Sequence, residues 1–380
     1  PKKKRLEIGI DFPRGSAFDC PECGKSGCKA YDTVEKKWRH LSFFQHEAYL
    51  HARVPRVECP NCGIKLVRVP WARPDSVFTL LFEALIMSLV KQMPVKAIAM
   101  LIGEQDTRLW RVLDHYVYRA REDVDLSGVR RIGIDETSSK RGHHYISVFV
   151  DLEETRVIYA TEGKDSETIE DFVADFKCHG GNPDAIEEVC CDMSPAFIKG
   201  VEESLPNAHL TFDKFHVTKI INNAVDEVRR QEQIHRPDLK KTRFIWLKNR
   251  ENLKKKQLRR LEEKDVRSLN LKTARAYHIR LTFQDLWNQS PENAKPFLKK
   301  WYFWATHSRL EPIIQAAKTV KRHWNGILRW FVSKINNGIL EGLNSLIQSA
   351  KSRARGYRSI RNMVTIVYLL GGKLKLGLTT

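Results

Sequence analysis

The order of strands and helices expected between residues 129 and 216 constrains the fold of this chain more than any other feature. Apolar residues alternate in VRRIGIDETS, HYISVFVDL and RVIYATEG, which predicts three strands in an antiparallel meander. A helix is expected over residues 166–177, where Gly180 and Gly181 then stop it. Two further strands are expected, one ending at Asp192 and one over HLTFDKFH.

This βββαβαβ order, with acids at the carboxyl ends of the first and fourth strands, is typical of an RNase H-like α/β domain with a mixed sheet. Those two strands are neighbours in such a sheet, and ligands bind beyond their carboxyl ends. We therefore expect Asp135 and Asp192 to meet in space. Glu136 competes with Asp135 but should point to the opposite face of its strand. For Asp213 and His216, a structural hydrogen bond is the preferred interpretation and substrate contact the alternative.

A third acid lies in the segment NNGILEGLNSLIQSAKSRARGY, residues 336–357, which predicts an amphipathic helix. Its polar stripe includes Asn344 and Gln348, with Glu341 as the only acid, and the cations Lys351, Arg353 and Arg355 follow that acid. We expect the helix to dock by its apolar side and to hold a metal, through Glu341, beside a phosphate backbone. An ordinary surface helix is the alternative. The apolar side comprises Ile335, Ile339, Leu343, Leu346, Ile347, Ala350 and Ala354.

Two CPxCG knuckles near the start predict a zinc site. Cys20 and Cys23 form the first, and Cys59 and Cys62 form the second. The spacing lets both sulfurs of a pair reach one tetrahedral Zn²⁺, and four cysteines close its coordination sphere, so the zinc would be structural. A β-rich insert should connect the pairs, and Cys28 lies outside the pattern.

The next stretch predicts three helices, over residues 76–93, 94–101 and 106–121, broken at Pro94 and Gly103. Short helices joined by a glycine turn fit a helix-turn-helix that reads the DNA major groove. Arg108 and Arg111 would then lie near base edges or phosphates, and plain helical packing is the alternative.

The region between His216 and Ile335 predicts a helical insertion of long charged helices, without a strand signal. Its lysine-rich run, KKKQLRR, is either a solvated face or a phosphate-neutralising surface. The aromatic run from Trp301 to Trp304 is expected to form the core of the insertion, and stacking on an unpaired base is the sharper alternative.

Net charge indicates the partner. The chain has 380 residues and a formal charge of +19, from 65 lysines and arginines against 46 acids. Such an excess favours a polyanion, and nucleic acid fits it best. No apolar run is long enough for a membrane span, and PKKKR opens the chain without a signal-peptide core. We expect a cytoplasmic, nucleoid-associated protein with no membrane partner.

Several blocks together resemble the DDE transposases of bacterial insertion sequences, in the ISL3 family. They are the CPxCG pairs, WRHLSFFQH, GIDET, EGKDSETI, DMSPAF, FDKFHV and EGLNSLIQSAKSRARGY. The resemblance implies that Asp135, Asp192 and Glu341 are the catalytic acids. We expect a zinc-binding domain, a helix-turn-helix, the first part of the RNase H-like domain, the helical insertion and a C-terminal catalytic part, over residues 1–70, 71–125, 126–220, 221–333 and 334–380.

The implied activity is DNA transposition. The protein would bind the terminal inverted repeats of its element, nick DNA with Mg²⁺-activated water and join the 3′-hydroxyl to a new phosphodiester. Two Mg²⁺ about 3.5–4 Å apart serve such chemistry, with Asp135 bridging them and Asp192 and Glu341 as further ligands. Processing two ends together predicts a homodimer or larger assembly on double-stranded DNA. A stand-alone nuclease of the same fold and a non-catalytic zinc-bearing DNA-binding regulator are the alternatives.

Overall fold

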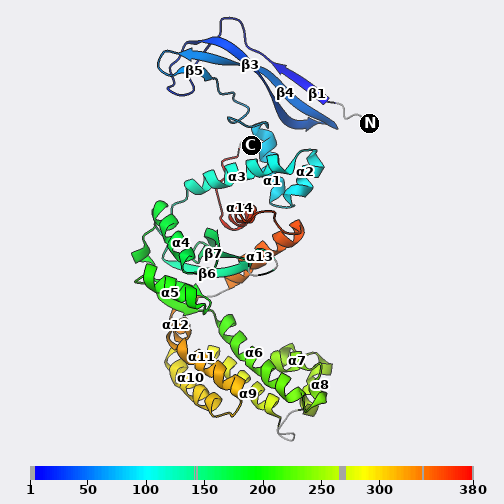
Figure 1. The fold of residues 1–380 in the computed structure, drawn as a ribbon, viewed down its shortest axis with the longest axis vertical. Coiled ribbons are helices and arrows are strands. Elements are labelled where there is room, and N and C mark those ends of the chain that lie inside the picture. The colour runs from blue at the N-terminus through cyan, green and yellow to red at the C-terminus, as the bar shows by residue number, and fades with distance from the viewer. Residues whose placement is uncertain (1–4, 141, 143, 265–270, 336–337, 379–380) are drawn as a thin grey trace. The chain divides into compact units, whose positions relative to one another are not determined.

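The computed structural model describes residues 5–140, 142, 144–264, 271–335 and 338–378 (Figure 1). Most of the basic pentamer PKKKR therefore lies outside the described residues. The chain divides into two compact units. One comprises Pro1–Asp123 with Ala350–Thr365 and Leu374–Thr380, and the other comprises Val124–Ser349 with Ile366–Lys373.

The first unit begins with a five-stranded sheet. Its order is β1-β4-β3-β2, and β5 pairs with β4. The long antiparallel hairpin of β3 and β4 is the β-rich insert expected between the cysteine pairs, and Trp38, Leu50 and Val54 are buried on it. The strands are β1 (Arg5–Ile10), β2 (Ala17–Phe18), β3 (Cys28–Phe43), β4 (His46–Cys59) and β5 (Gly63–Leu66).

Three helices follow, α1 (Leu80–Val90), α2 (Val95–Ile102) and α3 (Asp106–Glu122). The first begins four residues later than the expected Ser76, because Thr79 caps it by accepting a hydrogen bond from the Phe82 backbone N–H. Gly103 ends α2 in the left-handed conformation, at φ 73°. The helices pack through apolar stripes, as the sequence pattern predicts.

The second unit is built on a mixed sheet of order β10-β9-β6-β7-β8. Strands β6, β9 and β10 run parallel, whereas β7 and β8 continue from β6 as an antiparallel meander. This confirms the βββαβαβ order and the RNase H-like fold. The elements are β6 (Arg131–Ser138), β7 (Tyr145–Asp151), β8 (Arg156–Glu162), α4 (Glu167–Cys178), η1 (Pro183–Ala185), β9 (Glu188–Cys191), α5 (Pro195–Ser204) and β10 (His209–Phe212).

The two faces of this sheet differ in what covers them. Ile132 and Ile134 of β6 join the core beneath α4, where Phe149 stacks on Phe172 with ring centroids 4.4 Å apart. Gly133 alternates to the opposite face, which α13 (Gly338–Ala354) covers. A Cβ at Gly133 would lie 2.9 Å from both methyl groups of Leu340, so the close approach of α13 depends on glycine.

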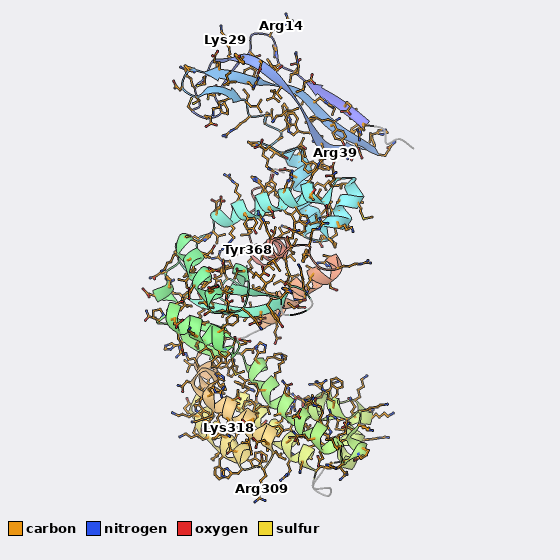
Figure 2. The ribbon with its side chains drawn as sticks, viewed as in Figure 1. Arg14, Lys29, Arg39, Arg309, Lys318 and Tyr368 are labelled. Carbon is orange, nitrogen blue, oxygen red and sulfur yellow. The ribbon has the colours of Figure 1, made fainter. Side chains whose placement is uncertain are left out.

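The edge strand β8 has a C-terminal partner. The hydroxyl of Tyr368, on α14 (Ile360–Gly371), accepts a hydrogen bond of 3.0 Å from the Ala160 backbone N–H, and Figure 2 labels this tyrosine. This hydrogen bond ties α14 to the backbone of the edge strand.

Between β10 and α13 the described chain is helical. The buried Trp246, Phe283 and Trp301 lie in its core. The elements are α6 (Lys214–Gln233), η2 (Pro237–Leu239), α7 (Arg243–Leu247), η3 (Arg250–Asn252), α8 (Lys255–Lys264), α9 (Lys272–Gln284), η4 (Asp285–Asn288), α10 (Pro291–Thr306), α11 (Glu311–Arg322) and α12 (Trp324–Ser333). Across the described chain, no helix has both the length and the apolar character that crossing a membrane requires.

Candidate active site and metal centre

The parallel pairing of β6 with β9 places two of the three acids side by side. Gly133 pairs with Cys190, and each predicted aspartate lies two residues further along the chain. Asp135 is therefore level with Asp192, which follows the last residue of β9. Because side chains alternate along a strand, both acids share the face of Gly133. The Ser194 backbone N–H donates a hydrogen bond of 2.9 Å to Asp192 Oδ1.

The third acid, Glu341, lies in the first turn of α13. Four residues of a helix advance about 6 Å, and two residues of a strand advance about 6.7 Å. Every fourth side chain of a helix can therefore lie opposite every second side chain of a strand that it packs on. On α13 this row is Leu340, Asn344 and Gln348. On β6 it is Gly133, Asp135 and Thr137.

Hydrogen bonds connect the two rows. Asn344 Nδ2 donates to Asp135 Oδ2 at 3.1 Å, and Asn344 Oδ1 accepts from Thr137 Oγ1 at 2.7 Å. Gln348 Nε2 donates to Thr137 Oγ1 and, at 3.2 Å, to the Ser138 carbonyl. These contacts fix the register of α13 against β6 and hence the position of Glu341.

The expected docking face of α13 is therefore wrong in part. Leu346, expected on the buried side, is 39 % exposed, and Ile335 precedes the helix. The expected polar stripe contributes Asn344 and Gln348 to the packed side, because β6 offers them hydroxyl, carboxylate and carbonyl partners. Residues 336–337 of the expected helix lie outside the described residues.

The three acids line a single cavity of about 380 Å³. Glu136, expected on the opposite face of β6, lines it too, as do Asp213 and His216. Within the described part of the chain, the ligand atoms of the four predicted zinc cysteines all lie within 4.8 Å of one another, whereas those of the three acids do not. The outer ligands of a two-ion site can lie up to about 8 Å apart, so a wider cavity still suits two ions.

Burial and neighbouring charge raise the pKa values of two carboxyl groups in this cavity. Burial raises the pKa of Asp135, opposed by hydrogen bonds from the Glu136 N–H and Asn344 and by the charge of His216, while the charge of Asp192 raises it further. The pKa of Glu136 is also raised, first by burial and then by Asp192. Carboxylates crowded in this way favour a bound cation, which compensates their mutual repulsion.

The DKFH segment contributes a further acid and a histidine. Asp213 follows the last residue of β10 and is the N-cap of α6, where it accepts a hydrogen bond of 2.8 Å from the Phe215 N–H. His216 lies in the first turn of α6, with Nδ1 3.6 Å from Asp213 Oδ2. The expected structural hydrogen bond is wrong, because 3.6 Å is too long for one and His216 Nδ1 is buried without a hydrogen-bond partner among the described residues. Both residues face the cavity instead.

The zinc-type cysteines come together as the sequence predicts. The sulfurs of Cys20, Cys23, Cys59 and Cys62 all lie within 4.8 Å of one another. The Asn61 backbone N–H is the main cause that lowers the pKa of Cys59 to about 6, whereas a hydrogen bond with Cys23 raises that of Cys62 to about 12. Four thiols gathered this closely fit a tetrahedral Zn²⁺.

Cys28 remains outside this set. It is buried beside the knuckles, and its thiol lies 3.4 Å from the Lys25 carbonyl, to which it donates. Its side chain therefore packs and bonds locally, in agreement with its place outside the CPxCG pattern.

The predicted DNA contacts are on helix surfaces. Arg108 and Arg111 are exposed on α3, and Arg108 is paired with Glu104 at 3.1 Å. Arg353 donates to the Gln92 carbonyl at 2.8 Å, which gives it a structural role. Lys351 lies in the last turn of α13, and Arg355 follows that helix. Their contact with DNA stays a prediction.

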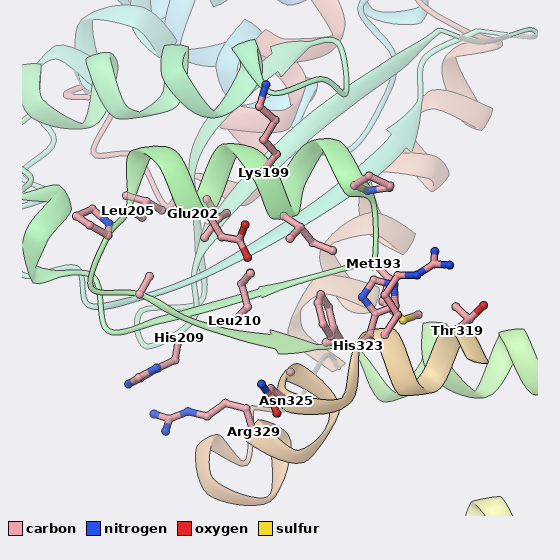
Figure 3. A pocket seen from close by; sticks show the side chains of 18 of the residues that line it. Met193, Lys199, Glu202, Leu205, His209, Leu210, Thr319, His323, Asn325 and Arg329 are labelled. Carbon is pink, nitrogen blue, oxygen red and sulfur yellow. The ribbon is translucent and has the colours of Figure 1, made fainter. Parts of the chain in front are cut away.

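A larger cavity of about 1020 Å³ lies between α5, β10 and the α11–α12 junction (Figure 3). Its labelled residues include Lys199, Glu202 and Arg329, and Arg329 is paired with Glu188. None of the three predicted catalytic acids lines it. The smaller cavity is therefore the candidate site, because it gathers the carboxylates.

Comparison with known proteins bears on the chain as a whole. Residues 132–367 match the ISL3-family DDE transposase model, described as transposase. Residues 67–117 match the helix-turn-helix domain of transposase family ISL3, and residues 16–62 match the zinc-finger of transposase IS204/IS1001/IS1096/IS1165.

Two curated relatives match over most of their length. The transposase for insertion sequence element IS1557 of Mycobacterium tuberculosis is 28% identical, over 91% of this chain and 85% of the relative. The transposase for insertion sequence element IS1001 of Bordetella parapertussis is 29% identical, over 91% and 87%. The family model alone spans more than half of the chain. The chain belongs to the ISL3 family of transposases.

Proposed function

We propose that this transposase cuts and joins DNA with Asp135, Asp192 and Glu341 as its catalytic acids. The observation that carries the proposal is their convergence on one cavity, from β6, the end of β9 and α13. Hard divalent cations take oxygen ligands and need only a few carboxylates. The donor set of this cavity, with five acids and no cysteine thiol other than that of Cys191, whose pKa burial raises strongly, fits Mg²⁺ better than a softer metal.

The chemistry divides between the ions and the chain. Asp135, Asp192 and Glu341 would hold the Mg²⁺ ions, and metal ions bound there would supply activation of the attacking oxygen and stabilisation of the leaving oxygen. The chain supplies orientation. Both oxygens of Asp135 accept a hydrogen bond, from the Glu136 N–H at 2.8 Å and from Asn344 at 3.1 Å, so its carboxylate plane is held fixed.

Recognition of the element ends is assigned to the other domains. The helix-turn-helix would read the terminal inverted repeats through α3, with Arg108 and Arg111 near bases or phosphates. Lys351, Arg353 and Arg355 would contact the backbone. Because two ends are processed together, we infer a homodimer or larger assembly on DNA. The proposed division is 1–70, 71–125, 126–220, 221–333 and 334–380.

A labelled duplex that carries one element end tests the proposal. With Mg²⁺ the protein should yield both nicked strands and products joined to target DNA. Asp135→Ala, Asp192→Ala and Glu341→Gln should abolish both products while duplex affinity stays within about twofold, because removing an acid does not weaken phosphate contacts. Ser345→Ala is the matched control, since Ser345 lines the same cavity on α13 without a carboxylate.

The same assay separates the alternatives. Cuts without joined products would favour a stand-alone nuclease of this fold. Binding of the end without any Mg²⁺-dependent product would favour a zinc-bearing DNA-binding regulator. Unchanged product yield in all three acid variants would overturn the catalytic assignment.

A further inference from the structure

The aromatic run of α10 divides between the core and the surface. Trp301 is 2 % exposed, and its Nε1–H donates to the Ile279 carbonyl at 2.9 Å. Phe303 and Trp304 are 64 % and 42 % exposed. The expected core role is thus confirmed for Trp301, whereas the two later rings are left at the surface.

The exposed rings belong to a continuous surface on α10. The His307 ring stacks on Phe303 with centroids 4.0 Å apart and planes at 29°. Lys299 and Lys300 are exposed one turn before the aromatic pair. The i, i+4 spacing places 299, 303 and 307 in one row and 300 and 304 in the next. These five residues are called the α10 face.

The charge of the α10 face is positive. Among the described residues, neither Lys299 nor Lys300 takes part in an ion pair. Glu292 lies in the first turn of the helix, nearly two turns before Lys299. Beyond the helix, Arg309 and Lys318 add cations to this part of the unit (Figure 2). An anionic partner therefore meets little repulsion at this surface.

Flat exposed rings interleaved with cations match the requirements of single-stranded nucleic acid. Every base has a π-face that can stack on an aromatic side chain, and lysines track the phosphates. We propose that the α10 face binds unpaired DNA, with bases stacked on Phe303 and Trp304 and phosphates beside Lys299 and Lys300. This goes beyond the proposed function, which requires only recognition of duplex ends and catalysis at the acids.

A second copy of the chain is a poorer occupant. A two-fold contact through the α10 face would place its lysines opposite the same lysines of the other copy. Like charges facing each other at an interface are unfavourable. In a polyanion with exposed bases, the bases can stack on the rings while the phosphates pair with the lysines.

Fluorescence anisotropy with a labelled 20-mer oligothymidine, without Mg²⁺, tests the inference. Phe303→Ala and Trp304→Ala should each weaken binding about 5- to 150-fold, the range for loss of one stacked base. Phe244→Ala is the control, because Phe244 is 58 % exposed on α7 and is not part of the α10 face. It should leave the affinity unchanged. Lys300→Ala should reduce the slope of log affinity against log salt by about 0.7.

An abasic oligonucleotide of the same length gives an independent readout on the unaltered protein. It should bind more weakly than oligothymidine, and Phe303→Ala should not weaken it further. Equal affinity of both oligonucleotides, or oligothymidine binding that survives the double substitution of Phe303 and Trp304, would overturn the inference. So would a double variant that changes only self-association in sedimentation. Because no cleavage is involved, failure here leaves the catalytic proposal untouched.

Discussion

Replacing Asn344 by alanine should weaken the attachment of α13 to β6. The side chain makes two hydrogen bonds, at 3.1 Å to Asp135 and at 2.7 Å from Thr137. A bond to a charged group contributes about 1.5–3 kcal/mol and a neutral bond about 0.5–1.5 kcal/mol. Asn344 is half-buried, so water replaces part of what is lost. We expect the free energy of unfolding of the sheet-bearing unit to fall by about 2 kcal/mol.

Urea unfolding followed by tryptophan fluorescence measures this loss. Ser345→Ala is the matched control, because Ser345 is the next residue on the same helix and is exposed. It should change stability by less than about 0.5 kcal/mol. The end-cleavage assay is run without urea, at a temperature where both variants are folded. Asn344→Ala should cleave more slowly than Ser345→Ala there, because Asp135 has lost one of its two orienting donors. Identical unfolding midpoints and identical cleavage rates for the two variants would refute the reasoning.

Three further predictions concern the glycine beneath α13, the zinc site and the response to pH. Gly133→Ala should destabilise the unit by about 1–3 kcal/mol, because a Cβ there would lie 2.9 Å from leucine methyl groups, whereas Gly128→Ala, with open space around it, should be near neutral in the same urea titration. Cys59→Ser should reduce bound zinc, measured by atomic absorption, and expose residues 16–62 to hydrogen exchange, while Cys28→Ser should retain the metal. Burial lowers the pKa of His323 from its usual 6.5, and the neighbouring arginine lowers it further. Below pH 6.5 the unfolded chain therefore binds more protons than the folded chain, and the free energy of unfolding decreases as the pH falls through 6.5. In thermal unfolding at pH 7 and pH 5, His323→Gln should reduce this loss, and an unchanged loss would contradict the assignment to His323.

The sequence predicted the sheet and two of the acids because both depend on short-range patterns. Alternating apolar residues define β6 and β9, and the rule that ligands lie beyond the carboxyl ends of parallel strands brings Asp135 and Asp192 together. The CPxCG repeat likewise specifies its own ligands. In each case the information lies within a few residues of the side chain concerned.

The contacts of α13 could not be predicted in this way. The hydrogen bond between Thr137 and Asn344 joins residues 207 positions apart. An amide on a polar stripe has the same local signature whether it faces water or a strand hydroxyl. Leu340, Asn344 and Gln348 are spaced i, i+4 and so share one side of the helix. That spacing becomes informative only once β6 is known to offer partners at matching intervals.

The run at residues 301–304 illustrates a related limit. Consecutive residues on a helix point about 100° apart, so four adjacent aromatic residues cannot share one environment. Trp301 is buried while Phe303 and Trp304 are exposed. Composition indicated an aromatic cluster, but the assignment of each ring to core or surface depended on where α9 and α11 pack.

Metal-directed cleavage of the polypeptide tests the central claim most directly. Fe²⁺ that replaces Mg²⁺ generates hydroxyl radicals in the presence of ascorbate and peroxide, and these cut only the backbone close to the ion. The account predicts simultaneous breaks near Asp135, Asp192 and Glu341, which Mg²⁺ competes away and which Glu341→Gln weakens at all three places. Breaks near one acid alone, or a pattern that Glu341→Gln leaves unchanged, would contradict a shared metal site.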